Sequence, residues 1–339
     1  MKGNSQMNSC VLGAGAWGTA IALHLMKCGH SVSLAPRRIE QAMLLTSIRE
    51  NKDYLSGFKL PESLQIGYEL EPILMEADVV FLACPAKGLR ALCERIINET
   101  KGHDHIKLIV ILSKGLEKDS FKMPYEVVRE YFPNTPVGIL SGPSFASEVA
   151  AEGPTALSLA VEICSPIMEE IQENMSNDKL RVYLTDDLKG VGYGGILKNI
   201  YAIGAGLCDG LKLGDNAKSA YITRALNEMV SIGKSLGGRR ETFYGLSGFG
   251  DLIATCFGEW SRNRTFGESL GKGVKSSQIL DGQKTVVEGF VAVECLYQIA
   301  RRDNLETPIL DEIHAIIYNN KSPELALNNL MVRHLKTEF

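Results

Sequence analysis

The stretch VLGAGAWGTAIALHL, residues 11–25, decides the fold of the N-terminal part of the chain. Gly13, Gly15 and Gly18 stand in GxGxxG spacing between a short apolar run and an amphipathic helical pattern, and a second apolar run follows at residues 31–36. In such a loop the first glycine permits a tight turn, the second lets the backbone approach a pyrophosphate, and the third permits close helix–strand packing. The spacing alone is a weak signal that a purely structural turn would also give. Its position between strand and helix predicts a dinucleotide site.

Apolar runs typical of buried strands alternate with helical patterns as far as about residue 160. They are SCVLGAG, SVSLAP, DVVFLACP, KLIVILSKG, PVGILSGP and TALSLAV, and a last run, LRVYLT, covers residues 180–185. This alternation indicates βαβ units, and therefore a parallel sheet with helices on both faces. From Asp187 onward the hydrophobic period is helical. We therefore predict an α/β fold: a Rossmann-like doubly wound domain over residues 1–186, then an all-helical domain over residues 187–339.

The composition argues against several classes of protein. The chain has 339 residues, 45% of them hydrophobic, and a formal net charge of −4, as expected of a globular protein with two domains. Its scattered lysines and arginines argue against a nucleic-acid partner. The start MKGNSQMNS lacks an apolar segment and no long apolar run follows, so we expect neither a secretory leader nor a membrane span.

Eight cysteines without a CxxC pair indicate free thiols in the cytoplasm. His103 and His105 lack further ligands at metal spacing, so we expect no metal site.

The end of the second predicted strand indicates which dinucleotide is bound. NAD-binding domains usually have an Asp or Glu at this point to bind the ribose, but the sequence here is SLAPRR and no carboxylate occurs before Glu40. Arg37 and Arg38 would instead suit the 2′-phosphate of NADP, because guanidinium groups bind phosphate in a bidentate manner. The alternative is that both arginines simply form a solvated turn. We expect NADP to be accepted alongside NAD.

Several loops have residues suited to a small phosphorylated substrate. SKGLE (113–117) and SGPSFA (141–146) follow strands, so they should lie at the carboxyl edge of the sheet, where open α/β sheets bind ligands. GLSGFGDLIATC is a second glycine-rich loop that leads into a helix, and WSRNRTFG (260–267) combines a helix start with charge and hydrogen-bond donors. Taken singly, each of these motifs is more often structural. Their joint occurrence beside a dinucleotide domain favours a phosphate site.

Lys198 is the single charge in GGILKNIYAIGAG, residues 194–206, a run of mostly apolar and small residues. One interpretation is a side chain whose stem packs while its ammonium reaches water. The other is a functional lysine, because lysines rarely enter an interior without a partner. Gly194 and Gly195 lie one turn before Lys198, and we expect their missing side chains to leave room for substrate and nicotinamide. Asn199 should help to hold the same face.

These motifs together resemble a known family. GAGAWGTA, SKGLE, SGPSFASEVA, GGILKNIYAIGAGLCDGLKLGDNAKSA, GFGDLIATC, SRNRTFG and VVEG are similar to the NAD(P)-dependent glycerol-3-phosphate dehydrogenase family of the soluble bacterial type. The likeness runs from about residue 9 to about residue 320, and the block that begins GGILKN is specific to the family. It implies reversible hydride transfer between NAD(P)H and dihydroxyacetone phosphate, giving sn-glycerol 3-phosphate for phospholipid synthesis, in a cytoplasmic homodimer.

The resemblance also implies roles for individual residues. Lys198 would donate and accept the proton and contact the substrate. The other implied substrate contacts are Lys114, Gly142, Ser144, Asp251, Ser261, Arg262 and Asn263. The implied cofactor contacts are Gly13, Gly15, Ala16, Trp17, Gly18, Arg37, Arg38, Lys114, Ala146, Arg262, Val286 and Glu288. Many bacterial members have serine in place of Ala16, so we expect the backbone N–H alone to serve the pyrophosphate there.

The chemistry of ketone reduction is compatible with a lysine. Hydride reduction needs a proton for the developing alkoxide, and the family motifs contain no histidine. Burial disfavours a charged lysine, whereas Asp251 or a substrate phosphate favours it, so we expect the two effects partly to cancel and leave a charged Lys198 that polarises the carbonyl. Two alternatives stay open. One is another enzyme of the same two-domain plan, such as a 3-hydroxyacid, 6-phosphogluconate or ketopantoate reductase, and the other is a dinucleotide sensor without activity.

Overall fold

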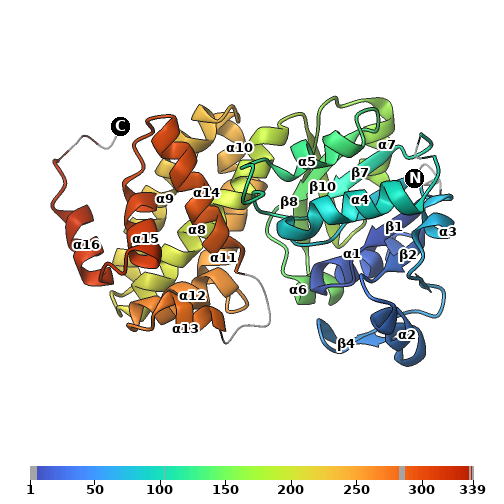
Figure 1. The fold of residues 1–339 in the computed structure, drawn as a ribbon, viewed down its shortest axis with the longest axis horizontal. Coiled ribbons are helices and arrows are strands. Elements are labelled where there is room, and N and C mark those ends of the chain that lie inside the picture. The colour runs from blue at the N-terminus through green and yellow to red at the C-terminus, as the bar shows by residue number, and fades with distance from the viewer. Residues whose placement is uncertain (1–5, 103, 282–286, 336, 338–339) are drawn as a thin grey trace. The chain divides into compact units, whose positions relative to one another are not determined.

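The structure, a computed structural model, describes residues 6–102, 104–281, 287–335 and 337. The chain divides into two compact units, Met1–Gly192 and Tyr193–Phe339. The division falls within α8 (Leu188–Gly210). The first unit combines a sheet with helices, whereas the regular elements of the second unit are helices throughout its described residues (Figure 1).

An eight-stranded sheet in the order β10-β9-β8-β7-β6-β1-β2-β5 forms the centre of the first unit. Its strands are β1 (Asn8–Leu12), β2 (Ser31–Ala35), β5 (Gln65–Ile66), β6 (Val79–Leu82), β7 (Leu108–Ile111), β8 (Val137–Ser141), β9 (Thr155–Val161) and β10 (Leu180–Thr185). Strands β3 (Glu50–Asn51) and β4 (Leu55–Lys59) form a separate antiparallel pair. The residues of β6, β7 and β8 are all buried, as expected for strands covered on both faces.

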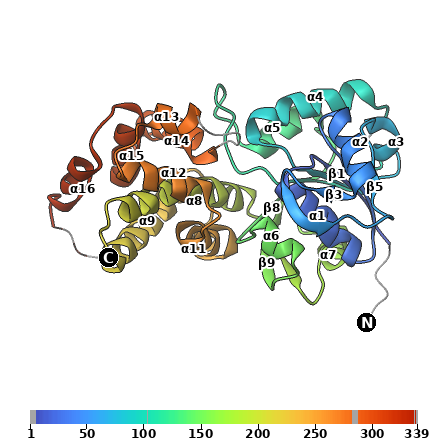
Figure 2. The ribbon, with the colours of Figure 1, turned by 90° about the horizontal axis from the view of Figure 1, so that it is seen from below.

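Helices cover both faces of the sheet. Figure 2 shows α4 (Leu89–Glu99) and α5 (Pro124–Tyr131) on one face, and α1 (Ala16–Lys27), α6 (Ala146–Ala150) and α7 (Pro166–Asn174) on the other. The unit is completed by α2 (Ile39–Ile48), α3 (Leu70–Leu74) and the 3₁₀ turn Ala86–Gly88. From β1 the strand order proceeds to β2 in one direction and to β6 in the other. Right-handed crossovers therefore place the helices on opposite faces, and the carboxyl ends of β1 and β6 flank the point where such sheets bind ligands.

The sheet is parallel except between β8 and β9, where the sequence pattern predicts a parallel pair and the structure has an antiparallel one. Ser141 pairs with Ser158 and Gly138 with Val161. The connection 142–154 contains only α6, a helix of five residues. Such a helix is about 7.5 Å long, whereas the five residues of β8 span about 17 Å. The chain therefore starts β9 near the edge at which β8 ends.

The second unit is helical in its described residues, as the hydrophobic period predicts. After α8 it contains α9 (Asp215–Ser235), α10 (Arg240–Tyr244), the π-helical turn Leu246–Gly250, α11 (Asp251–Phe257), α12 (Arg262–Gly271), α13 (Ser276–Asp281), α14 (Glu288–Arg302), α15 (Pro308–Tyr318) and α16 (Pro323–Met331). The predicted glycine-rich loop before Asp251 is thus a π-helical turn that leads directly into α11.

Glycines let α8 and α12 pack backbone against backbone. A Cβ on Gly206 would lie 1.9 Å from the carbonyl oxygen of Arg264, and one on Gly267 would lie 1.9 Å from that of Ile203. Neither position can hold a side chain without separating the helices. This packing brings the first turn of α12 beside the middle of α8.

Within the described ranges, no helix is both long and apolar enough to cross a membrane. The same part of the chain contains no cluster of three or more His, Cys, Asp or Glu placed to hold a metal ion. His105 bonds the backbone carbonyl of Leu74, and His103 lies outside the described residues. Cys10, Cys93, Cys208 and Cys256 are buried free thiols, as predicted, whereas Cys164 is exposed.

Candidate active site

Lys198 lies in the middle of α8 and is only 8% exposed. Its ammonium donates a hydrogen bond of 2.8 Å to the hydroxyl of Thr255 and lies 3.1 Å from Oδ1 of Asp251. Asp251 and Thr255 are also buried. Partners within the protein therefore hold the ammonium, and it does not extend into solvent as a snorkelling lysine would. A buried charge in this arrangement depends on its counter-charge, because an unpaired ammonium is costly to bury.

Asp251 and Thr255 come from the same face of α11, four residues apart. The Thr255 hydroxyl donates to the carbonyl oxygen of Asp251 at 2.6 Å, which directs its own oxygen toward the ammonium of Lys198. Thr255 is a site residue that the motifs alone did not predict. The signal that could have found it is the helical spacing from Asp251 in GDLIATC.

An asparagine pair links three elements beside Lys198. Asn263, on the first turn of α12, donates to Oδ1 of Asn199 at 2.8 Å, and its own Oδ1 accepts from the N–H of Gly289 at 2.9 Å. Asn199 also donates to Glu288 at 3.4 Å and to the Gly195 carbonyl at 3.3 Å. The structure thus brings two of the predicted residues, Asn263 and Glu288, to the residue that follows Lys198. Asn199 holds this face, as expected.

The first turn of α12 contains the other two residues of the SRN motif. Ser261 is buried and caps the helix, because its hydroxyl accepts from the backbone N–H of Arg264 at 3.2 Å. Arg262 is the first residue of the helix and is exposed. Val286, predicted as a cofactor contact, lies outside the described residues.

The role expected of Gly194 is wrong. A Cβ at this position would lie 2.7 Å from the carbonyl oxygen of Ser247, in the π-helical turn. Gly194 therefore makes room for protein backbone, because α8 and the π-helical turn pack against each other there, and it does not leave space for a ligand.

The glycine loop of the first unit has the features of a dinucleotide site. Gly13 has φ of 117°, and its Cβ would lie 2.4 Å from the Ala83 carbonyl oxygen, while a Cβ on Gly18 would lie 2.0 Å from the Gly13 carbonyl oxygen. Both glycines are required by the fold. A Cβ on Gly15, by contrast, would meet no protein atom within 4 Å. The open space beside Gly15, at the N-terminus of α1, fits a pyrophosphate approaching the backbone.

Two residues that the sequence analysis missed hold this loop. The Ala14 carbonyl accepts from Nε2 of Gln41 at 2.9 Å and from Nδ2 of Asn51 at 3.0 Å. Asn51 is buried and also donates to the Thr19 hydroxyl at 2.8 Å. No local sequence motif marks either residue, because both lie in the segment after the second strand.

Lys114, Gly142 and Ser144 come together at the carboxyl ends of β7 and β8. The Gly142 carbonyl accepts from Nζ of Lys114 at 3.3 Å and from the Ser144 hydroxyl at 2.9 Å. Nearby on the chain, the hydroxyls of Ser113 and Ser141 are buried and have no hydrogen-bond partner within the described part of the chain. Buried polar groups normally have partners, so this edge of the sheet suits a polar ligand.

The remaining predicted cofactor residues surround the same sheet edge. Arg37 and Arg38 are exposed after β2. Burial raises the pKa of the Cys84 thiol to about 12, and the Arg37 guanidinium opposes this effect, so Arg37 lies near the end of β6. Trp17 and Ala146 are partly buried against the hydrophobic core. Ala16 is the first residue of α1.

Comparisons with known proteins agree with this geometry. Residues 8–165 match the family model described as NAD-dependent glycerol-3-phosphate dehydrogenase N-terminus, and residues 187–328 match the model described as the C-terminus. A relative from Lysinibacillus sphaericus, named glycerol-3-phosphate dehydrogenase [NAD(P)+], is 40% identical over 97% of each chain. A relative of the same name from Syntrophotalea carbinolica is 41% identical over 98% of this chain and 100% of its own. The chain belongs to the NAD-dependent glycerol-3-phosphate dehydrogenase family.

A solved structure agrees with this assignment. The crystal structure of glycerol-3-phosphate dehydrogenase from Coxiella burnetii has a TM-score of 0.90 and 34% identity, and the match covers 97% of this chain and 99% of that one. As a member of the glycerol-3-phosphate dehydrogenase family, the chain is an NAD(P)-dependent oxidoreductase that acts on a CH–OH group. Family membership favours this activity over the other two-domain reductases and over a sensor without activity.

Proposed function

We propose that the chain catalyses reversible hydride transfer between NAD(P)H and dihydroxyacetone phosphate, giving sn-glycerol 3-phosphate for phospholipid synthesis. The observation that carries this proposal is the buried ammonium of Lys198, 3.1 Å from Asp251 and hydrogen-bonded to Thr255. Asn199, the next residue, is bonded to Asn263 and Glu288, which belong to two further motifs of the resemblance. The named relatives support the choice of substrate.

Lys198 acts as the proton donor and acceptor. NAD(P)H, when bound, supplies the hydride. Asp251 keeps the lysine charged, and Thr255 fixes the direction of its ammonium. In the reductive direction Lys198 polarises the substrate carbonyl and gives a proton to the developing alkoxide. In the oxidative direction the same group takes the proton back.

Arg262 binds the substrate phosphate in this proposal. Arg262 is an exposed residue at the start of α12, where the helix N-terminus also favours an anion. Asn263 and Ser261 hold that turn through the bonds described above. Lys114, Gly142 and Ser144, in the first unit, remain proposed substrate contacts.

The cofactor contacts are proposed from the glycine loop and the residues after β2. Gly13, Gly15, Ala16 and Gly18 present the backbone at the start of α1, and Trp17 adds packing. The exposed pair Arg37 and Arg38 supports acceptance of NADP alongside NAD. Ala146, Lys114, Arg262 and Glu288 are further proposed contacts, as is Val286, outside the described residues.

The wider organisation follows from the same proposal. Residues 1–186 would bind the dinucleotide, and residues 187–339 would bind the substrate and form a homodimer. We further propose that the protein works in the cytoplasm, because its free thiols suit a reducing compartment.

Steady-state reduction of dihydroxyacetone phosphate, with NADPH and NADH in parallel, tests the function and the cofactor together. Lys198→Ala should lower kcat by about 100-fold or more, with an unchanged Kd for NADPH. Lys234, an exposed lysine of α9, offers the matched control Lys234→Ala. Near-normal turnover in Lys198→Ala would show that another group moves the proton.

The phosphate assignment has its own test. Arg262→Ala should raise KM for dihydroxyacetone phosphate, whereas the exposed control Arg224→Ala should not. If KM is unchanged in Arg262→Ala, the phosphate binds elsewhere.

A further inference from the structure

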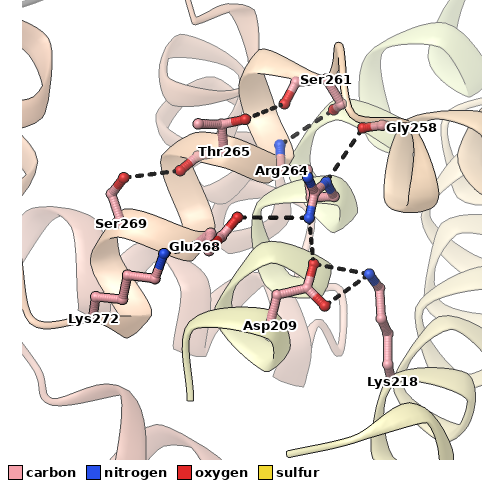
Figure 3. Close-up of polar contacts among 9 residues, drawn as sticks. All are labelled: Asp209, Lys218, Gly258, Ser261, Arg264, Thr265, Glu268, Ser269 and Lys272. Carbon is pink, nitrogen blue, oxygen red and sulfur yellow. Dashed lines mark hydrogen bonds and ion pairs between the residues drawn. The ribbon is translucent and has the colours of Figure 1, made fainter. Parts of the chain in front are cut away.

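A cluster of charged side chains joins three helices of the second unit (Figure 3). Lys218, on the first turn of α9, donates to both carboxylate oxygens of Asp209 at 2.8 Å. Arg264, on α12, donates through Nη1 to the same carboxylate at 2.8 Å. The side chains of Lys218 and Arg264 are only 9% and 17% exposed. This geometry differs from that of an ordinary surface ion pair, because one partly buried carboxylate holds two cations.

Arg264 extends the cluster to the connection between α11 and α12. Its Nε donates to the carbonyl oxygen of Gly258, the residue that follows α11, at 3.3 Å. Its backbone N–H donates to the hydroxyl of Ser261, the residue that caps α12. The N–H of Ser261 donates to the same Gly258 carbonyl at 3.2 Å. Arg264 therefore holds both ends of the segment Gly258–Ser261.

Lys218 contributes from the other side of the connection. Its ammonium lies 4.8 Å from the centre of the Phe257 ring, a cation–π contact with the last residue of α11. The cluster therefore contacts the end of the helix that presents Asp251 and Thr255, and the start of the helix that presents Arg262.

The cluster is not needed to dock α12 onto α8. The backbone contacts at Gly206 and Gly267 already bring these two helices together. The cluster instead fixes the position of the connecting segment Gly258–Ser261. Arg262, the proposed phosphate-binding residue, follows this segment directly in the chain. Side chains that bind a phosphate must be held to within a fraction of an ångström, so the groups that fix their backbone affect affinity without touching the ligand.

We propose that Asp209, Lys218 and Arg264 are positioning residues. They hold the backbone of the segment Gly258–Ser261 in place and thereby orient Arg262, the next residue, toward the substrate phosphate. The inference rests on the proposed function, because it takes Arg262 as the group that binds the substrate phosphate. Asp209 is central to the cluster because its carboxylate accepts from both Lys218 and Arg264. Without its charge, Lys218 loses its carboxylate partner and, among the described carboxylates, Arg264 keeps only Glu268, 3.6 Å from its Nη1, which lies on α12 itself and does not tie Arg264 to α8.

The first test is Asp209→Asn, which keeps the shape and removes the charge. KM for dihydroxyacetone phosphate should rise about tenfold, and the inhibition constant of inorganic phosphate, measured against this substrate, should rise in parallel. The Kd of NADPH should change less than these two constants, because most of the proposed cofactor contacts lie in the first unit and Arg262 is one of the few in the second. Asp303→Asn is the matched control, since Asp303 forms an exposed ion pair with Arg302.

The second variant, Arg264→Lys, keeps the positive charge and is the safer one for folding. A lysine lacks the planar guanidinium whose separate nitrogens let Arg264 donate to Asp209 and to the Gly258 carbonyl at the same time. The variant should therefore raise KM and the phosphate inhibition constant as Asp209→Asn does, whereas the exposed control Arg224→Lys should keep both near the wild-type values. Unchanged constants in both Asp209→Asn and Arg264→Lys would overturn the proposal. An equal loss of substrate affinity, kcat and NADPH binding would also overturn it, since that pattern indicates general damage to the fold.

Arg262→Ala, measured in the same series, separates the two proposals. If Arg262→Ala raises KM while Asp209→Asn and Arg264→Lys do not, the positioning role fails and the phosphate assignment stands. If Arg262→Ala leaves both constants unchanged, the phosphate assignment itself fails, and the positioning role with it.

Discussion

The hydroxyl of Thr255 offers a direct test of how the ammonium of Lys198 is held. It accepts from Lys198 at 2.8 Å and donates to the Asp251 carbonyl at 2.6 Å, in a site where all three residues are buried. Thr255→Val keeps the shape of the side chain and removes only the polar atom. We expect the variant to fold and to bind NADPH as the wild type does.

The size of the effect follows from this bond. A hydrogen bond to a charged group contributes about 1.5–3 kcal/mol, which corresponds to roughly a 10- to 150-fold loss of kcat/KM if the bond persists in the transition state. Asp251 still neutralises Lys198 in this variant, so the loss should be smaller than that in Lys198→Ala. Thr255→Ser keeps the hydroxyl and should stay within a few-fold of the wild type.

The assay is reduction of dihydroxyacetone phosphate at saturating NADPH, followed by absorbance, with Tm measured for each variant. A Thr255→Val enzyme whose kcat/KM lies within twofold of wild type, with normal Tm, would refute the assigned role. Equal losses in the serine and valine variants would also refute it, because packing of the methyl group and not the hydroxyl would then be the cause.

Three further predictions concern stability and the cofactor. Burial raises the pKa of Glu228 to about 7, so between about pH 5 and pH 7 the folded state keeps a proton that the unfolded state has already released. As the pH rises from 5 to 8, this carboxyl should therefore lower the free energy of unfolding by roughly 2–3 kcal/mol, and equal pH slopes for wild type and Glu228→Gln in urea unfolding would contradict it. Gly15→Ala should weaken NADPH binding with little change in Tm, whereas Gly206→Ala should lower Tm strongly, since only the Cβ at position 206 would meet backbone. A larger loss of Tm in Gly15→Ala than in Gly206→Ala would count against both assignments. Asn51→Leu removes a donor to the Ala14 carbonyl and should raise the Kd of NADPH about tenfold, measured by fluorescence titration; an unchanged Kd would show that Asn51 does not set the loop.

Much of the fold could be predicted because it depends on local spacing. The glycine loop, the alternation of strands and helices, and the change to helical period near Asp187 each follow from residues that are close together in the sequence. The direction of β9 could not be predicted from strand patterns, since parallel and antiparallel strands have the same period. It depends on the connection 142–154, whose single short helix cannot return the chain along β8.

The sequence offers candidate residues for the site but not the contacts among them. Lys198 and Asp251 both belong to sequence motifs, yet their pairing depends on how α8 and α11 pack. Thr255 was missed because its function comes from a partner 57 residues away. Asn51 was missed for the same reason, since the loop that it holds lies 37 residues before it.

The glycines show why the type of residue alone cannot identify a ligand site. Gly13, Gly15 and Gly194 all stand in motifs of the family resemblance; the motifs predict a ligand beside Gly15 and Gly194, and a tight turn at Gly13. A Cβ on Gly13 or Gly194 would meet protein backbone at less than 3 Å, so the packing of the chain is enough to require glycine at both. Only Gly15 has no such requirement, since a Cβ there would meet nothing within 4 Å. Among these three glycines, then, only Gly15 supports a bound ligand, and in the second unit the catalytic assignment depends on the buried charge of Lys198 and the partners that hold it.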